Sequence, residues 1–87
     1  MKTEKILEKE TLKWLERLEA KTKNIKLIDV KGAWALENIK AYISDSKYFH
    51  KKGDLVRAFE AIVYAYGIYE TALHSNLIVN EGRLEKP

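Results

Sequence analysis

The stretch from Gly53 to Asn76, GDLVRAFEAIVYAYGIYETALHSN, decides the fold. Gly53 can end one helix in a left-handed conformation, and the Asp54 carboxylate can cap the next helix by accepting from its first free N–H groups. Behind that cap, apolar residues recur three and four positions apart, which places them on one helical face. These residues are Leu55, Ala58, Phe59, Ile62, Ala65, Tyr66, Tyr69, Ala72 and Leu73. The opposite polar strip is narrow, so this helix must be covered on more than one side. The strip consists of Arg57, Glu60, Tyr64, Thr71 and Ser75.

The composition indicates one small globular domain that spans residues 1–87. The chain is 46% hydrophobic and 33% charged, and it contains no cysteine. The absence of cysteine excludes disulfides, a thiolate nucleophile and a cysteine-type zinc site. No apolar run approaches the roughly 20 residues that span a membrane, and the charged N-terminus leads into no signal sequence. We therefore expect a cytoplasmic protein.

A first helix is expected at about residues 3–23, beginning near Thr3 and Glu4. Its inner face holds Leu7, Thr11, Trp14, Leu15, Leu18 and Thr22. Its outer face carries a row of bases at i,i+4 spacing: Lys5, Lys9, Lys13, Arg17 and Lys21. Such a row extends over about 24 Å and could follow a phosphate backbone. Acidic neighbours at i,i+3 spacing favour an ordinary solvated face instead, so nucleic-acid binding by this row is the alternative function.

The segment from Asn24 to Lys31 breaks the helical period, because apolar residues alternate with Lys26 and Asp29. In isolation this pattern is typical of a short strand. No second segment resembles a strand that could pair with it. We therefore interpret it as the end of the first helix and a linker that covers one end of the bundle.

The second helix is expected at about residues 33–52 and the third at about 54–76, joined by a tight turn at Gly53 and Asp54 and followed by a tail at 77–87. The core stripe of the second helix is Ala35, Leu36, Ile39, Tyr42, Ile43, Ser46 and Phe49. In the tail, residues 77–79 are expected to pack back onto the bundle.

Apolar residues also occur outside these core stripes, which points to self-association as a homodimer, since contiguous exposed apolar patches mark interfaces. On the second helix, Trp34, Ala41 and Tyr48 lie seven apart. On the third helix, Ala61 and Ile68 lie on one flank and Val63 on the other, while Gly67 permits close approach of another backbone. The interface candidates are Trp34, Ala41, Tyr48, Ala61, Val63, Gly67 and Ile68.

No catalytic or metal-binding motif is present. The four glycines form no phosphate-binding loop or nucleophile elbow, and His50 and His74 fall in no H-E-x-x-H pattern. Glu70 and His74 at i,i+4 could supply two metal ligands, but a helix-end ion pair explains them as well. We expect no catalytic residues, no cofactor and no metal.

The string SDSKYFHKKGDLVRAFEAIVYAYG at 44–67 resembles the signature of a family of small, uncharacterised, all-helical archaeal proteins, a domain of unknown function. In that signature a D-A-K-Y-F-like stretch meets K-G-D, then A-F, then Y-A-x-G. The matching positions are Asp45, Lys47, Tyr48, Phe49, Gly53, Asp54, Ala58, Phe59, Tyr64, Ala65 and Gly67, and Ser46 replaces the usual alanine. The resemblance implies a helical hairpin with an N-terminal helix and brings no activity.

Two other families share this hairpin pattern. The K-G-D break with Phe49 before it and Ala58 and Ala65 after it is similar to one tetratricopeptide repeat, but such arrays need several repeats and this chain has one. The HEPN nucleotide-binding and ribonuclease domains also have a paired-helix core. Their ribonuclease members place four to six residues between an Arg and a His, but after Arg57 these positions hold apolar or tyrosine side chains.

The sequence therefore predicts an all-α protein: a three-helix bundle with a tight hairpin between the second and third helices, which forms a homodimer. The function predicted from it is a non-enzymatic protein–protein interaction or self-association module.

Overall fold

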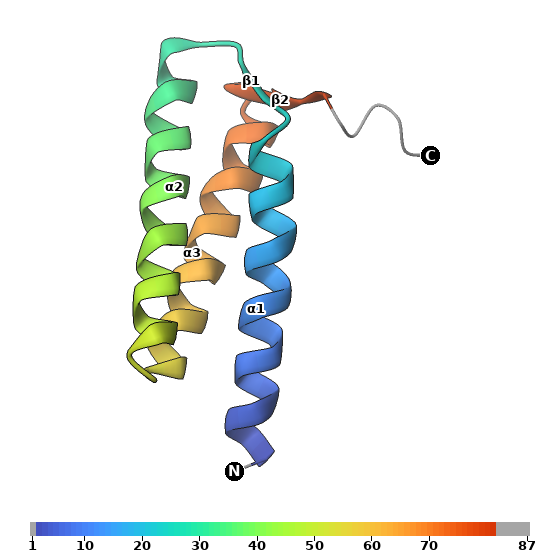
Figure 1. The fold of residues 1–87 in the computed structure, drawn as a ribbon. Helices are drawn as coiled ribbons and strands as arrows, with labels where there is room; N and C mark the ends of the chain where they lie inside the picture. The colour runs from blue at the N-terminus through green and yellow to red at the C-terminus, as the bar shows by residue number, and fades with distance from the viewer. Residues whose placement is uncertain (1, 82–87) are drawn as a thin grey trace.

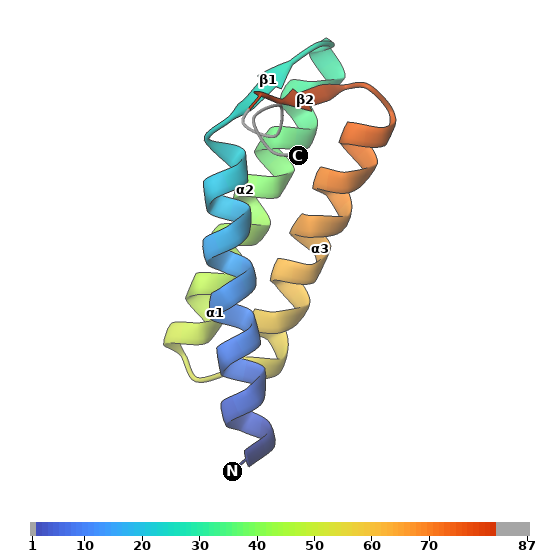
Figure 2. The ribbon, with the colours of Figure 1, turned by 90° about the vertical axis from the view of Figure 1, so that its right-hand side faces the viewer.

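Three helices and a small two-stranded sheet make up the computed structural model, which describes residues 2–81 (Figures 1 and 2). The helices are α1 (Lys2–Thr22), α2 (Val30–Lys51) and α3 (Leu55–His74), and the strands are β1 (Ile25–Leu27) and β2 (Ile78–Asn80). The predicted three-helix bundle with its tight hairpin is confirmed. The prediction placed the start of α2 three residues late, at residue 33. Residues 82–87 of the expected tail lie outside the described residues.

The helix α3 is the centre of the bundle. It packs against α2 along most of its length and against α1 on a second side, while α1 and α2 touch each other at few places (Figure 1). The buried hydrophobic side chains of the helices are Leu15 and Leu18 from α1, Ala35, Ile39 and Ile43 from α2, and Ala58, Ala61, Ile62, Ala65, Tyr69 and Ala72 from α3. Most of the predicted core positions are therefore confirmed, because each helix turns its apolar stripe inward.

Small side chains let α2 and α3 approach closely. Ser46 and Ala58 are fully buried at this contact, and the Ser46 hydroxyl donates a hydrogen bond to the Ala58 carbonyl oxygen at 2.6 Å. Nearby, the rings of Tyr42 and Tyr64 stack with centroids 5.6 Å apart. The hydrogen bond satisfies a buried hydroxyl that would otherwise destabilise the core.

The turn between α2 and α3 is a Schellman motif. Gly53 has a positive φ of 82°, its N–H donates to the His50 carbonyl at 3.0 Å, and the Asp54 N–H donates to the Phe49 carbonyl at 2.9 Å. The Asp54 carboxylate then accepts from the Arg57 N–H at 3.1 Å and caps α3. The predicted left-handed glycine and aspartate cap are both confirmed.

The interpretation of residues 25–27 as a linker is wrong, because they form β1 and pair antiparallel with β2. Ile25 lies opposite Asn80 and Leu27 lies opposite Ile78. The partner strand was hidden in the expected tail, since three residues are too short to show a strand pattern. Ile78 is nevertheless buried, so the expected packing of this segment on the bundle is confirmed.

The side chain of Asn80 links the small sheet to the helices through hydrogen bonds. Its amide nitrogen donates to the Tyr69 hydroxyl at 2.6 Å and to the Lys21 carbonyl oxygen at 3.1 Å. The first hydrogen bond joins β2 to the Tyr69 side chain of α3, and the second joins β2 to the last turn of α1. A buried amide with these partners holds β2 against both helices.

Gly32, in the first turn of α2, lies directly against the segment that follows α3. A β-carbon at this position would come within 2.3 Å of the Leu77 carbonyl oxygen, which is backbone and cannot rotate away. Only glycine therefore permits this contact between the two segments.

The left-handed turn generates the first prediction. Replacing Gly53 by Val should lower the free energy of unfolding by more than about 1 kcal/mol, because a β-branched residue is strained at positive φ. Thermal and denaturant melts of the variant and the parent measure the difference, and an unchanged melt would contradict the prediction.

The second prediction compares two helical glycines, Gly32 and Gly67, of which only Gly32 lies against another segment of backbone. Gly32→Ala should destabilise the fold by about 1–3 kcal/mol, because the added methyl group overlaps the backbone at Leu77. Gly67→Ala is the control, since no described atom lies within 4 Å of the added group, and it should stabilise the helix by roughly 0.5–1 kcal/mol. Denaturant melts in dilute solution measure both, and a shift of the same sign for both variants would refute the assignment of the close contact to Gly32.

Candidate functional site: an apolar groove on the helical hairpin

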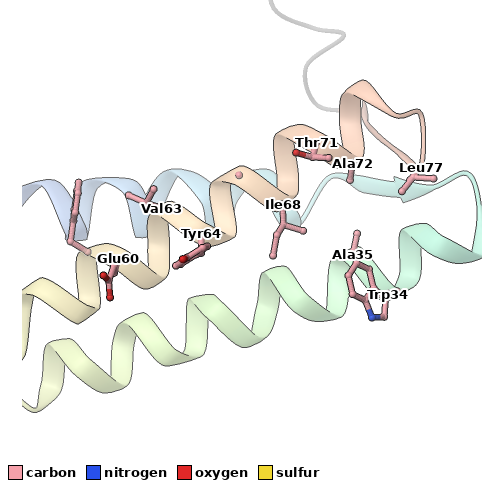
Figure 3. Close-up of a pocket in the computed structure, with 11 residues that line it drawn as sticks. Trp34, Ala35, Glu60, Val63, Tyr64, Ile68, Thr71, Ala72 and Leu77 are labelled. Carbon is pink, nitrogen blue, oxygen red and sulfur yellow. The ribbon is translucent and has the colours of Figure 1, made fainter.

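An open groove of about 610 Å³ runs between α2 and α3 (Figure 3). From α3 it is lined by Phe59, Glu60, Val63, Tyr64, Gly67, Ile68, Thr71 and Ala72. Trp34 and Ala35 of α2 and Leu77, which follows α3, complete the lining. Among residues 2–81, none of the lining residues belongs to α1, so the groove lies on a part of the hairpin that α1 leaves uncovered.

The groove exists because α3 is apolar around most of its circumference, while α1 and α2 cover only two of its sides. Three large side chains consequently remain open to water: Trp34 is 65% exposed, Tyr64 61% and Val63 50%. Within the described lining, Glu60 is the only carboxylate, and the other polar groups are hydroxyls and the indole N–H. An apolar patch of this kind is typical of an interaction surface.

Two features shape the floor of the groove. The Tyr64 ring is held by stacking on Tyr42, with an angle of 23° between the ring planes. Gly67 leaves a hollow on α3, because no described atom lies within 4 Å of where its β-carbon would be. At one end of the groove, the large ring of Trp34 lies beside Ala35 and below Ala72 in Figure 3.

The structure brings together some of the predicted interface residues and separates the others. Trp34, Val63, Gly67 and Ile68 line the groove. Ala41 and Tyr48 are exposed but lie outside the lining. Ala61, which was predicted as an interface residue, is only 6% exposed and is therefore buried within the chain rather than available to a partner.

Sequence reasoning missed several groove residues. It placed Phe59 in the core and Tyr64 and Thr71 on the narrow polar strip of the third helix, whereas the structure places all three in the groove. Leu77 joins the lining because Asn76 takes a left-handed φ of 60° and turns the chain back at the end of α3. The one sequence signal for these missed residues was Tyr64, because tyrosine has an amphipathic ring and exposed tyrosines are common at interfaces.

The basic row of α1 is a second candidate surface. Lys5, Lys9 and Arg17 are exposed, but Lys13 forms an ion pair with Glu10 at 3.2 Å. The Arg17 guanidinium lies over the Trp14 ring, 5.6 Å from its centroid. The row is therefore partly engaged by its own helix.

Three further contacts of titratable side chains join α1 to the other helices. Glu8 pairs with His50 at 2.8 Å and Glu19 pairs with Lys47, and both pairs link α1 to α2. Burial raises the pKa of the Tyr66 phenol above its ordinary value, and the neighbouring Arg17 opposes this shift only in part. Tyr66 therefore stays neutral in the aromatic contact between α1 and α3.

Metal-binding clusters and membrane-spanning helices, within the described residues, also bear on function. No group of three or more His, Asp or Glu side chains within residues 2–81 is arranged to hold a metal ion. None of the described helices combines the length and apolar character that would let it cross a membrane.

Comparisons with known proteins point to a single family. The model of the family described as "Protein of unknown function (DUF357)" matches residues 8–78. Protein AF1782 from Archaeoglobus fulgidus, whose crystal structure carries the same family label, is 46% identical in sequence. The two structures superpose with a TM-score of 0.82, over 90% of this chain and 97% of that chain. No curated protein matches this chain.

The basic row generates a prediction about salt. If it binds duplex DNA, log affinity should fall with log salt with a slope near −0.9 for each phosphate contacted. We expect only weak binding that is lost near physiological salt, because ion pairing and cation–π contacts engage part of the row. Titration at several salt concentrations measures the slope, with Lys5→Gln/Lys9→Gln as the variant. Tight binding that persists at about 0.2 M salt would make the basic row, rather than the groove, the leading candidate for the functional surface.

Proposed function

This chain belongs to the DUF357 family of proteins of unknown function, and we propose that it is a cytoplasmic, non-enzymatic module that associates with a second copy of itself through the groove between α2 and α3. The observation that carries the proposal is the apolar groove, with Trp34 standing exposed at one end. An exposed Trp beside an apolar hollow is typical of the anchors that dominate interface energetics.

The size of the hairpin face suits a dimer. The helices α2 and α3 contain 22 and 20 residues, so each is about 30 Å long and about 10 Å across. Side by side they present roughly 600 Å² in projection. That area approaches the roughly 800 Å² of accessible surface that each partner contributes to a standard interface.

The distribution of charge favours this face over α1 for self-association. Two copies that met through α1 would bring rows of lysines together, and like charges oppose such contact. The groove instead offers one carboxylate, Glu60, among apolar side chains. Charge repulsion therefore opposes self-association less at the groove than at the basic row of α1.

The chemistry of the groove also supports a non-enzymatic role. Acid–base catalysis usually combines titratable groups whose environments separate their pKa values. Glu60 has no second acid or basic side chain among the described residues that line the groove. Binding through apolar contact is the use that these side chains support best.

Nucleic-acid association remains the alternative function. It would use the exposed part of the basic row, where Lys5 and Lys9 lie on the outer face of α1. Since this row lies on a different helix from the groove, both functions can be tested independently.

Sedimentation equilibrium tests self-association. The parent should have twice the 10.1 kDa mass of the chain at micromolar concentration, whereas Trp34→Glu should sediment as a monomer because a charge would be buried in the interface. Ser44→Glu is the matched control, since Ser44 is exposed on α2 outside the groove lining and about 80° around the helix from Trp34, and it should remain a dimer. Circular dichroism checks that each variant folds, and a monomeric parent would refute the proposal.

A further inference from the structure

The residues that α3 contributes to the groove are arranged symmetrically along the helix. They form four adjacent pairs: Phe59 with Glu60, Val63 with Tyr64, Gly67 with Ile68, and Thr71 with Ala72. The midpoint of this set falls between residues 65 and 66. A half-turn about an axis that lies beside α3, perpendicular to it and level with that midpoint, therefore places each pair opposite another pair of the same set in a second copy, as the interface of a two-fold dimer requires.

We propose that two copies of the chain pair antiparallel along α3, about a two-fold axis that runs between the two α3 helices, level with residues 65 and 66. This inference rests on the proposed self-association and adds its geometry. Each contact occurs twice, once on either side of the axis.

The pairs that this axis creates are complementary in size. The Tyr64 ring meets the partner's Gly67, where the hollow on α3 gives it room. Phe59 meets the partner's Ala72 in a second contact between a large and a small side chain. Large and small residues on facing positions interdigitate without voids, as in well-packed cores.

The remaining pairs are complementary in chemistry. Val63 meets the partner's Ile68, so two branched apolar side chains are removed from water together. Glu60 meets the partner's Thr71, whose hydroxyl can donate to the carboxylate. The only carboxylate in the described lining of the groove thus gains a hydrogen-bond donor when the interface excludes water.

A parallel two-fold pairing lacks this complementarity, because it sets every α3 residue against its own copy. Glu60 would then meet the partner's Glu60 in a surface that excludes water, where two like charges are strongly unfavourable. Tyr64 would also meet the partner's Tyr64, which leaves the hollow at Gly67 unfilled. The antiparallel arrangement is the one that the side chains favour.

Trp34 has a defined place in the antiparallel pair. It lies on α2 at the end of the groove formed by Thr71, Ala72 and Leu77 (Figure 3). Reversal of the partner brings this end over the partner's Phe59 and Glu60. Each tryptophan consequently covers the far end of the other chain's groove, so neither groove is closed without the second copy.

Cysteine crosslinking tests the geometry, because the chain contains no cysteine of its own. Glu60 and Thr71 are 11 residues apart, which places two copies of either position about 16 Å apart along the helices. Disulfides form only when the α-carbons lie within roughly 7 Å. Neither Glu60→Cys nor Thr71→Cys should therefore crosslink alone.

A mixture of the two single variants should form a disulfide-linked dimer on mild oxidation, in several-fold greater yield than either variant alone. The second Glu60–Thr71 contact keeps its native side chains in that mixed dimer. The matched control mixes Glu60→Cys with Ser44→Cys, which lies outside the groove lining on another face of α2 and should give only background crosslinking. Non-reducing electrophoresis reads the yields.

The outcomes separate this inference from the proposed function. Crosslinking of Glu60→Cys with itself would show parallel pairing and overturn the inference. A sedimenting dimer without a crosslink in the mixture would also overturn the antiparallel geometry, while self-association itself would stand. A monomeric parent in sedimentation would overturn both.

Discussion

The close contact of α2 with the alanine face of α3 is the constraint on which the rest of the structure depends. Ala58, Ala61, Ala65 and Ala72 are all buried there, and Ser46 donates into the backbone of α3 at Ala58. Small side chains let the two helices approach closely, but each buries little apolar area. Larger side chains must therefore supply most of the buried apolar area. Leu15 and Leu18 of α1 supply part of it on a second side of α3. A third side of α3 is left without cover, and the groove lies along it.

Both ends of α3 are held by local hydrogen bonding, which explains why the groove has defined walls. The Schellman turn at Gly53 fixes how α2 and α3 lie against each other at one end. At the other end, Asn76 takes a left-handed conformation, and the Leu77 N–H bonds to the Ala72 carbonyl at 3.0 Å. This second turn directs the chain over Gly32 and into β2, and it places Leu77 in the groove. The small sheet and Asn80 then hold that end in place.

The basic surface and the apolar surface of the bundle lie on different helices. The outer face of α1 is basic and engaged in part by acidic and aromatic neighbours, while the hairpin exposes apolar side chains on the flank that α1 does not cover. The relative from Archaeoglobus fulgidus shares this fold over nearly its whole length, so the hairpin that carries the groove belongs to the common fold. The family description assigns it no activity. Apolar contact between helices is the chemistry that the surface offers, and it needs no cofactor.

The sequence by itself determined the features that depend on neighbouring residues. The three helices, their core stripes, the left-handed Gly53 and the Asp54 cap all follow from periodicity and capping within a few positions. It also indicated that Trp34, Val63, Gly67 and Ile68 lie outside the main core stripes. Only the tertiary structure decided which of those residues share a surface. Ala61 is buried by the packing of the bundle, and β1 exists because Ile25 pairs with Asn80, 55 positions away. Gly32 is required because backbone from beyond α3 passes over it. Contacts of this range depend on how helices pack, which no local pattern encodes.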